Sequence, residues 1–158
     1  AGCVPAGTFT YARPAMQVPP MVDPTARPAL ETLRDRGYTL AVVSNTMRTP
    51  GAALRELLAQ YGLLPCFAHT TFSDEVGVRK PHPEIFALTL RAVGGTAEAA
   101  VHVGDDAVLD VQGARAAGMR AIQVKSRPVD APGARAPDAT IPRLDALPEA
   151  IARLEAAG

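Results

Sequence analysis

Short apolar stretches alternate with longer amphipathic stretches along most of this chain, and this alternation limits its possible folds more than any other feature. The stretches 38–44, 100–104 and 120–124 are apolar and rich in β-branched residues, which is typical of buried strands, and 67–72 is a weaker example. Proline and glycine residues mark the ends of helical patterns between them. Strands that alternate with helices of such lengths predict a three-layer α/β fold, in which helices cover both faces of a parallel sheet.

The predicted strands and helices form one domain. We expect an irregular N-terminal segment over residues 1–22 and an α/β core domain over residues 23–158. The stretch 126–138 is rich in proline, arginine and alanine, so we expect an exposed connector there, and we interpret the arginines of 127–143 as solvated rather than as a binding patch. Helices are expected at 23–37, 49–62, 83–94, 106–118 and 145–157.

Composition argues against some kinds of partner. Hydrophobic residues make up 47% and charged residues 20% of the chain, so a packed core is expected. Lys and Arg together number 16, as do Asp and Glu, and this balance argues against nucleic acid or an anionic membrane as the partner. Two cysteines, Cys3 and Cys66, and no visible signal peptide or membrane-spanning run favour a cytoplasmic protein with reduced thiols. The sequence does not indicate an oligomeric state.

Polar residues follow the predicted strands at the points where parallel sheets bind ligands. Ser44 and Asn45 end the first strand, Lys80 follows the second, and Asp105 follows the third. Because the carboxyl ends of parallel strands meet at one edge of a sheet, these side chains are expected to converge there. Lys80 can neutralise an oxyanion, and the Ser44 hydroxyl and the Asn45 amide can donate hydrogen bonds to it. The residue types therefore predict a phosphate site.

Three carboxylates are crowded after the third strand, at Asp105, Asp106 and Asp110. Crowded carboxylates repel one another unless a cation lies between them or they face water. Taken alone, the cluster is as consistent with helix capping and a solvated first turn as with a site. Together with Ser44 and Lys80 at matching strand ends, it favours a Mg²⁺ site in which Asp105 and Asp110 are ligands and Asp106 binds or caps the helix.

The histidines are not predicted to be ligands. His69 and His82 have no partner at metal-ligand spacing, and His82 is interpreted as a turn or helix-start residue. His102 alternates inside an apolar strand, so we interpret it as a packed core histidine.

Three stretches, in this order, resemble motifs of the haloacid dehalogenase superfamily. They are LAVVSNT (40–46), GVRKPHPEIF (77–86) and HVGDDAVLDVQGARAAGM (102–119). The resemblance covers about residues 23–125 and implies a Rossmann-like three-layer fold. A receiver-type signalling domain uses similar residue types, but its acids come first in the chain and its Lys-Pro pair last, so the order seen here counts against it.

This resemblance implies a role for each residue of the predicted site. Ser44 and Lys80 are implied to be the catalytic residues that grip the transferring phosphoryl group, and Asn45 is expected to bind the phosphate beside them. Asp105 is implied to bind Mg²⁺ directly, and Asp110 to complete the acidic pocket or to act from behind it. The sequence VGDD favours the phosphohydrolase branch, since the dehalogenase branch typically lacks the Gly-Asp pair and needs no metal.

The resemblance also implies a nucleophile motif, DxDGT, whose first aspartate forms the covalent intermediate. No such motif precedes Ser44, and the only acid upstream of Glu31 is Asp23, which we interpret as a helix start. The closest match is VPAGTF, which has Val4 and Ala6 where the aspartates belong.

In the family, the strand that carries this motif lies in the middle of the sheet, between the strands of the second and fourth motifs. Without it, two central strands lack a neighbour, and unpaired buried backbone groups cost about 1–3 kcal/mol each against a total stability of about 5–15 kcal/mol. We expect the slot to be filled by the segment 8–12, TFTYA, or by chain outside this sequence. The other possibility is that the strands 38–44 and 100–104 pair directly.

Two functions remain open at this point. The first is the core of a Mg²⁺-dependent phosphohydrolase, without a large cap, that acts on a small phosphorylated metabolite and lacks its nucleophile strand. The second is a non-catalytic module of the same fold that binds phosphate and metal or a protein partner.

Overall fold

The computed structural model describes residues 23–125 and 135–157, so the predicted segment 1–22 lies outside the described part. The described strands all run parallel to their neighbours: β1 (Ala41–Ser44), β2 (His69–Phe72), β3 (Val101–Gly104), β4 (Arg120–Val124) and β5 (Ala139–Ile141). β1 pairs with β2 in one sheet, and β3, β4 and β5 form a second sheet in that order. All four strands that the sequence predicts are confirmed.

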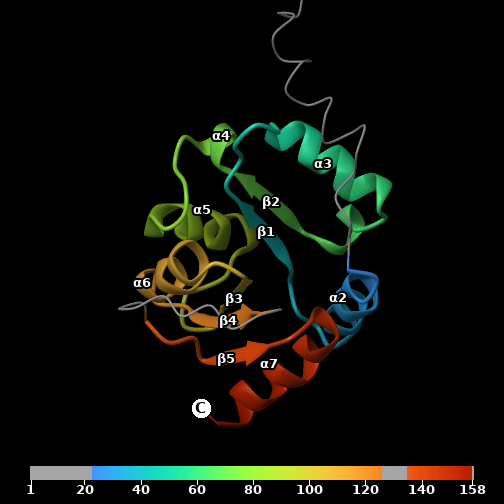
Figure 1. Cartoon of the computed structure of the whole chain (residues 1–158), viewed down its shortest axis with the longest axis vertical. Helices are drawn as coiled ribbons and strands as arrows, with labels where there is room; N and C mark the ends of the chain where they lie inside the picture. Colours follow the sequence, from blue (N-terminus) through green and yellow to red (C-terminus); the bar gives the residue numbers. More distant parts are fainter. Residues whose placement is uncertain (1–22, 126–134, 158) are drawn as a thin grey trace, which may run out of the picture.

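Helices lie on both sides of the strands (Figure 1). α5 (Pro83–Val93) and α6 (Gly113–Ala116) cover one face, and α2 (Ala26–Asp35), α3 (Gly51–Gln60) and α7 (Leu147–Ala156) cover the other. The shorter helical segments are η1 (Leu64–Cys66), α4 (Ser73–Val76), η2 (Ala107–Gln112, a π-helical turn) and η3 (Leu144–Ala146). The predicted α/β fold is therefore confirmed. Among the described helices, none has the length and apolar character needed to cross a membrane.

One short strand lies within the stretch 127–143 that the sequence interpretation treats as solvated. Residues 139–141 form β5 beside β4, and Ile141 is buried, so the interpretation of 127–143 as solvated is wrong at its end. A strand of three residues is too short to show an alternating pattern, and its neighbours are prolines and arginines, which explains the miss. Residues 126–134 lie outside the described part.

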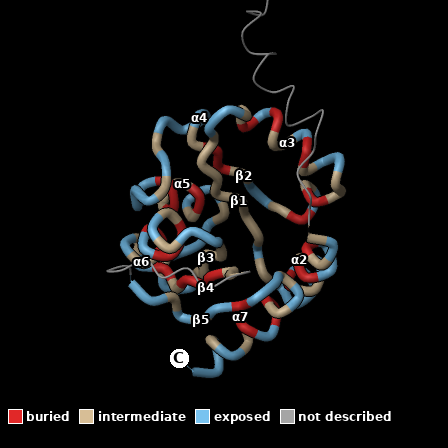
Figure 2. The backbone as a smooth tube through the Cα atoms, in the orientation of Figure 1, coloured by how far each residue is buried: buried red, intermediate tan, exposed pale blue. Residues whose placement is uncertain are grey.

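The core has two halves, one on each side of the strands (Figure 2). On β4, Ile122 packs against Leu33 of α2 and Ile151 of α7. The neighbouring residue, Ala121, points to the opposite face and packs with Phe86 of α5. Burial of a side chain such as Phe86 stabilises the fold by roughly 1.5–3 kcal/mol. Alternation along one strand thus joins both helix layers to the sheet.

β1 and β3 are not paired with each other in the described part of the chain. Every residue of both strands is only partly buried, whereas the middle of β4, between two neighbours, is fully buried. The direct pairing of β1 with β3, the other possibility that the sequence leaves open, is therefore not found in the described part of the chain. The segment 8–12, which we expect in the slot, lies outside the described residues.

Candidate active site

The predicted site residues Lys80 and Asp110 form an ion pair at the carboxyl edge of the strands. Lys80 Nζ lies 2.6 Å from Asp110 Oδ1, and the two side chains are only 12% and 6% exposed. Lys80 belongs to the loop before α5, and Asp110 belongs to η2, which follows β3. The convergence that the strand ends predict is thus found, although the two residues are 30 positions apart in the chain.

His102 is a further member of this cluster. Its Nε2 lies 2.9 Å from the same Asp110 oxygen, and its ring packs edge-on against Phe86 at 5.0 Å between centroids. An ionised carboxylate only accepts hydrogen bonds, so Nε2 is the protonated nitrogen in this pair. The sequence interpretation of His102 as a core histidine is right about the packing and misses the hydrogen bond. The signal that was available is its position two residues before Gly104, which puts both on one face of β3.

Gly104 makes room for Asp110. A Cβ atom at position 104 would lie 2.2 Å from Asp110 Cγ, which is closer than atoms can approach. The backbone N–H of Asp106 donates to Asp110 Oδ2 at 3.0 Å and fixes the second oxygen. Asp110 lies on the π-helical turn η2, and such turns occur frequently at functional sites. Its carboxylate is therefore positioned by backbone shape as well as by Lys80.

Asn45 connects the end of β1 to the loop that carries Lys80. The Asn45 side chain donates from Nδ2 to the Lys80 carbonyl at 2.9 Å and accepts from the Lys80 N–H on Oδ1 at 2.8 Å. This double hydrogen bond holds the Lys80 backbone beside Ser44, the last residue of β1. The Ser44 hydroxyl makes no hydrogen bond to another described residue. Ser44, Asn45 and Lys80, the predicted phosphate-binding residues, thus lie close together.

The electrostatics of Asp110 favour its charged form. Burial raises the pKa of the Asp110 carboxyl, but the hydrogen bond from His102, the hydrogen bond from Lys80 and the positive charge of Lys80 outweigh burial, so the pKa lies well below its ordinary value. The carboxylate is thus ionised throughout the neutral range, and it in turn holds the Lys80 ammonium in place.

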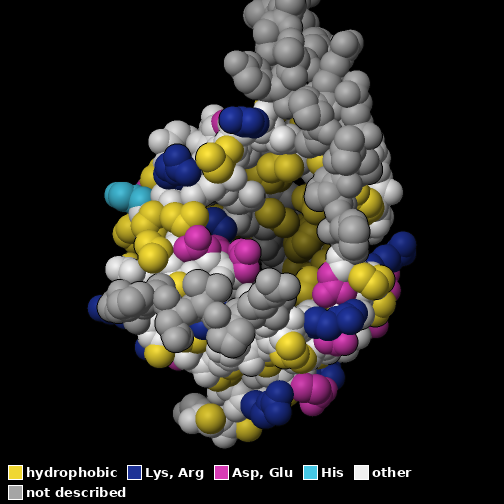
Figure 3. Space-filling view, viewed as in Figure 1, with side chains coloured by type: hydrophobic (Ala, Val, Ile, Leu, Met, Phe, Trp, Pro, Cys, Tyr) yellow, Lys and Arg dark blue, Asp and Glu magenta, His cyan; other side chains and the backbone are white. Residues whose placement is uncertain are grey.

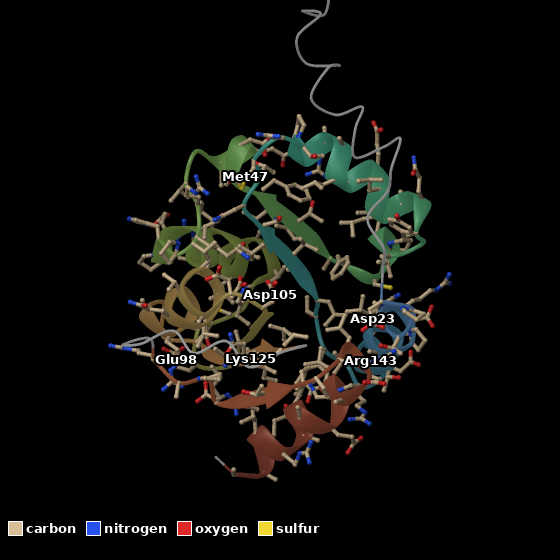
Figure 4. All side chains as sticks on the ribbon, in the orientation of Figure 1. Asp23, Met47, Glu98, Asp105, Lys125 and Arg143 are labelled. Carbon is tan, nitrogen blue, oxygen red and sulfur yellow. The ribbon has the colours of Figure 1, made fainter. Side chains whose placement is uncertain are left out.

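The predicted metal ligands differ in how they are engaged. Asp105 is exposed. Its backbone carbonyl accepts a hydrogen bond from the Gln123 side chain at 3.0 Å, whereas its carboxylate has no partner among the described residues. Asp106 accepts from the N–H groups of Val108 and Leu109, so its predicted capping role is confirmed. Figure 4 shows Asp105 near the centre of the view, and Figure 3 shows acidic side chains there at the rim of a hollow that contains hydrophobic side chains.

These residues fit a metal only in part. Asp105 offers carboxylate oxygens of the kind that Mg²⁺ prefers. A metal bound directly to Asp110 Oδ1 would lie against the Lys80 ammonium, so the contacts of Asp110 favour a role behind the ligands, and its direct ligation stays a prediction. Among the described residues, no three His, Cys, Asp or Glu side chains come together as a metal site. Further oxygen ligands would have to come from water, phosphate or another segment.

A second polar cluster, which the sequence does not predict, follows β1. Thr46 and Ser73 share a hydrogen bond, and Asp74 accepts from the Thr46 hydroxyl at 2.9 Å and from the Gly51 N–H at 3.0 Å. A cavity of about 250 Å³ opens beside it, lined by Thr46, Met47, Arg48, Pro50 and Asp74. The side chains of Thr46 and Asp74 satisfy each other and the start of α3, so the cluster holds the loop in shape.

Comparison with known proteins adds an independent observation. The sequence model of the haloacid dehalogenase-like hydrolase family matches residues 11–118 of this chain. The phosphoserine phosphatase of Thermus thermophilus is 41% identical over 101 residues, which are 64% of this chain and 39% of that protein. The chain spans about two fifths of the length of the curated relatives that it matches.

Two solved structures share the fold. The crystal structure of a HAD phosphatase from Thermococcus onnurineus superposes with a TM-score of 0.78 and 32% identity, and the match covers 89% of this chain and 64% of that one. The 2-haloacid dehalogenase of Pseudomonas syringae pv. Tomato DC3000 superposes with a TM-score of 0.72 and 35% identity, covering 85% of this chain and 54% of that one. Similarity therefore extends to both phosphatases and dehalogenases.

Proposed function

Because this chain belongs to the haloacid dehalogenase-like hydrolase family, we propose that it carries the phosphate-binding half of a phosphomonoesterase site. The observation that carries the proposal is the Lys80–Asp110 ion pair, held beside the end of β1 by Asn45. An ammonium that is largely buried and directed by a carboxylate is suited to an anionic group such as a phosphoryl oxygen.

Each residue of the proposed site has one task. Lys80 places its positive charge against the phosphoryl group, and the Ser44 hydroxyl and the Asn45 N–H donate hydrogen bonds to its oxygens. Asp110 positions the Lys80 ammonium, and His102 donates a hydrogen bond to the Asp110 carboxylate. Mg²⁺, when bound at Asp105, would supply positive charge against the same group. These groups bind and orient a phosphate, but none of them is an activated nucleophile.

The proposal covers phosphate binding and not turnover, because no DxDGT motif lies upstream of Ser44 in this sequence. Transfer of the phosphoryl group to the protein would require a carboxylate that this sequence does not contain there. The second candidate function, a non-catalytic module that binds phosphate or a partner, needs no such carboxylate. The two candidates share the binding site and differ in turnover.

The proposed ligand is a small phosphorylated metabolite in the cytoplasm. The phosphoserine phosphatase relative supports a phosphate monoester, whereas the likeness to a dehalogenase supports only the shared scaffold. Within this chain, the Gly104-Asp105 pair and the Lys80–Asp110 pair favour phosphate over a haloacid, since an organic halide offers no dianion for a metal and an ammonium to hold.

Titration of the whole chain with inorganic phosphate, followed by amide NMR signals, tests the site. The signals of Ser44, Asn45 and Lys80 are expected to shift in a saturable way. Lys80→Met is expected to weaken binding at least about tenfold, which corresponds to about 1.4 kcal/mol. The control is Arg91→Met, which removes an exposed cation on α5 and is expected to bind as the wild type does. Equal binding by the two variants would contradict the proposal.

Calorimetric titration with Mg²⁺ tests the metal part separately. Weak binding is expected, since a site with few carboxylates has little ligand charge. Asp105→Asn is expected to abolish the heat, and Asp35→Asn, an exposed charge on α2, is expected to leave it unchanged. Equal heats for the wild type and Asp105→Asn would remove Asp105 from the site.

A further inference from the structure

Gln123 is a polar side chain in a buried part of the sheet. It lies on β4 beside Gly104 of β3 and is only 3% exposed. The residues before it on β4, Ala121 and Ile122, are apolar and also buried. A buried amide group costs free energy unless it makes hydrogen bonds, so a glutamine at this place needs a polar partner.

The partner of Gln123 belongs to the loop that follows β3. The Gln123 side chain donates from Nε2 to the backbone carbonyl of Asp105 at 3.0 Å. β3 ends at Gly104, so this hydrogen bond links β4 to the residue directly after the end of β3. The Gln123 side chain thus extends the connection between the two strands into the loop that carries the predicted metal ligand.

The peptide unit that joins Asp105 to Asp106 is held at both of its polar groups. Gln123 donates to the Asp105 carbonyl, and the Asp106 N–H donates to Asp110 Oδ2 at 3.0 Å. Because a peptide unit is planar, hydrogen bonds to both its carbonyl and its N–H fix the orientation of the plane. The backbone next to the Asp105 Cα atom is therefore held in one orientation.

The Asp105 carboxylate remains available for a ligand. It is exposed and has no partner among the described residues, although both polar groups of the following peptide are engaged. Asp105 lies near the centre of the view in Figure 4. Hydrogen-bond partners behind a metal ligand orient that ligand, and their loss typically lowers metal affinity by about 10–100-fold. A fixed backbone with a free carboxylate therefore suits a metal ligand.

We propose that Gln123 is a positioning residue, which fixes the peptide between Asp105 and Asp106 and thereby directs the Asp105 carboxylate toward a bound Mg²⁺. The inference rests on the metal part of the proposed function. Gln123 itself contacts neither the metal nor the phosphate and acts through the backbone. Asp110 holds the other end of the same peptide but also holds Lys80, so a change at Gln123 separates the metal half of the site from the phosphate half.

Titration of the full chain with Mg²⁺, followed by the amide NMR signal of Asp105, tests the proposal. Gln123→Met keeps an unbranched side chain but removes the N–H donor. It is expected to weaken Mg²⁺ binding at least about tenfold. Its affinity for inorganic phosphate in the absence of Mg²⁺ is expected to equal that of the wild type, since the proposed phosphate-binding residues make no contact with Gln123. A general loss of structure would instead weaken both affinities.

Thr89→Val is the matched control for the loss of a buried hydrogen bond. The Thr89 side chain is 5% exposed, and its hydroxyl lies 2.7 Å from that of Thr71, away from the loop after β3. The variant is expected to be less stable than the wild type in urea denaturation and to bind Mg²⁺ as tightly as the wild type does. A stability loss by itself is then shown not to change metal affinity.

A second measurement needs no variant. In the wild type, the NMR signals of the Gln123 side-chain NH₂ group are expected to shift with Mg²⁺ at the same concentrations as the Asp105 amide signal. The reason is that the two groups share the hydrogen bond at the Asp105 carbonyl. Saturation of the Asp105 signal without any shift of the Gln123 side chain would overturn the proposal.

Two further results would overturn it. The first is equal Mg²⁺ affinity of the wild type and Gln123→Met, which would leave the proposed function intact. The second is an equal loss of Mg²⁺ affinity in Gln123→Met and Thr89→Val. If the wild type binds no Mg²⁺ at all, the metal part of the proposed function fails together with this inference, whereas phosphate binding is tested independently.

Discussion

Position 104 shows how one missing side chain shapes the site. A Cβ atom there would lie 2.4 Å from Asp110 Oδ2 as well as against Cγ, so Gly104→Ala has to displace the carboxylate from Lys80. Urea denaturation is expected to show a free energy of unfolding lower by about 1–3 kcal/mol. Gly95→Ala, whose Cβ would meet nothing closer than 3.4 Å, is the control and is expected to be nearly neutral. A neutral Gly104→Ala would contradict this packing.

The Asp110 carboxylate gives stability a dependence on pH. Its pKa is lowered on folding, so its contribution is fully present above the unfolded value of about 3.9 and is lost as the pH falls through the folded value. Asp110→Asn leaves Lys80 buried without its partner and is expected to lower the free energy of unfolding at pH 7 by about 3–5 kcal/mol. Below about pH 4 the difference from wild type is expected to shrink.

Urea denaturation of both proteins between pH 3 and 7 measures this effect. The control is Asp105→Asn, an exposed carboxylate, which is expected to change stability little at any pH. A difference between wild type and Asp110→Asn that stays constant from pH 7 to pH 3 would show that the ion pair is not its source.

At the level of elements, the Asn45 side chain is the link between β1 and the loop before α5. Asn45→Ala leaves the Lys80 N–H and carbonyl without their partners, and the free energy of unfolding is expected to fall by about 1–3 kcal/mol. Phosphate affinity is expected to fall as well, although the Lys80 side chain is unchanged, since the loop loses its position. Phosphate titration by NMR and urea denaturation measure the two effects.

Thr32→Val is the matched control for this link. It removes a polar side chain whose hydroxyl donates to the Pro28 carbonyl within α2, far from the site in the chain. It is expected to leave phosphate affinity unchanged. If Asn45→Ala also binds phosphate as tightly as the wild type, the double hydrogen bond does not position Lys80.

For the molecule as a whole, the proposed function predicts binding without turnover. The purified chain is expected to hydrolyse a generic phosphomonoester no faster than background, because positioning groups without a nucleophile leave most of the barrier in place. A phosphatase assay with a mock purification as the control measures this. Activity that is robust in the wild type, absent from the mock sample and lost in Lys80→Ala would reveal a nucleophile that the sequence does not show.

The sequence by itself determined the four longer strands, the main helices and the edge at which the site lies. These features depend on local patterns: β-branched runs make strands, Pro83 begins α5, and Gly94 ends it in the left-handed conformation at φ 69°. Strands in a parallel sheet share one carboxyl edge, so the meeting of Lys80 and Asp110 follows from their places after strands.

Only the tertiary structure decided which side chains touch at that edge and which strands pair. The hydrogen bond between His102 and Asp110 requires the absence of a side chain at Gly104, next to the carboxylate, and the π-helical turn η2 that carries Asp110. Neither feature produces a periodic pattern in the sequence. β5 is stable as a strand because β4 lies beside it, not because of its own three residues. Among the described residues, β1 and β3 do not pair with each other, although residues in or next to both strands pack into the same two clusters, and such pairing depends on distant contacts.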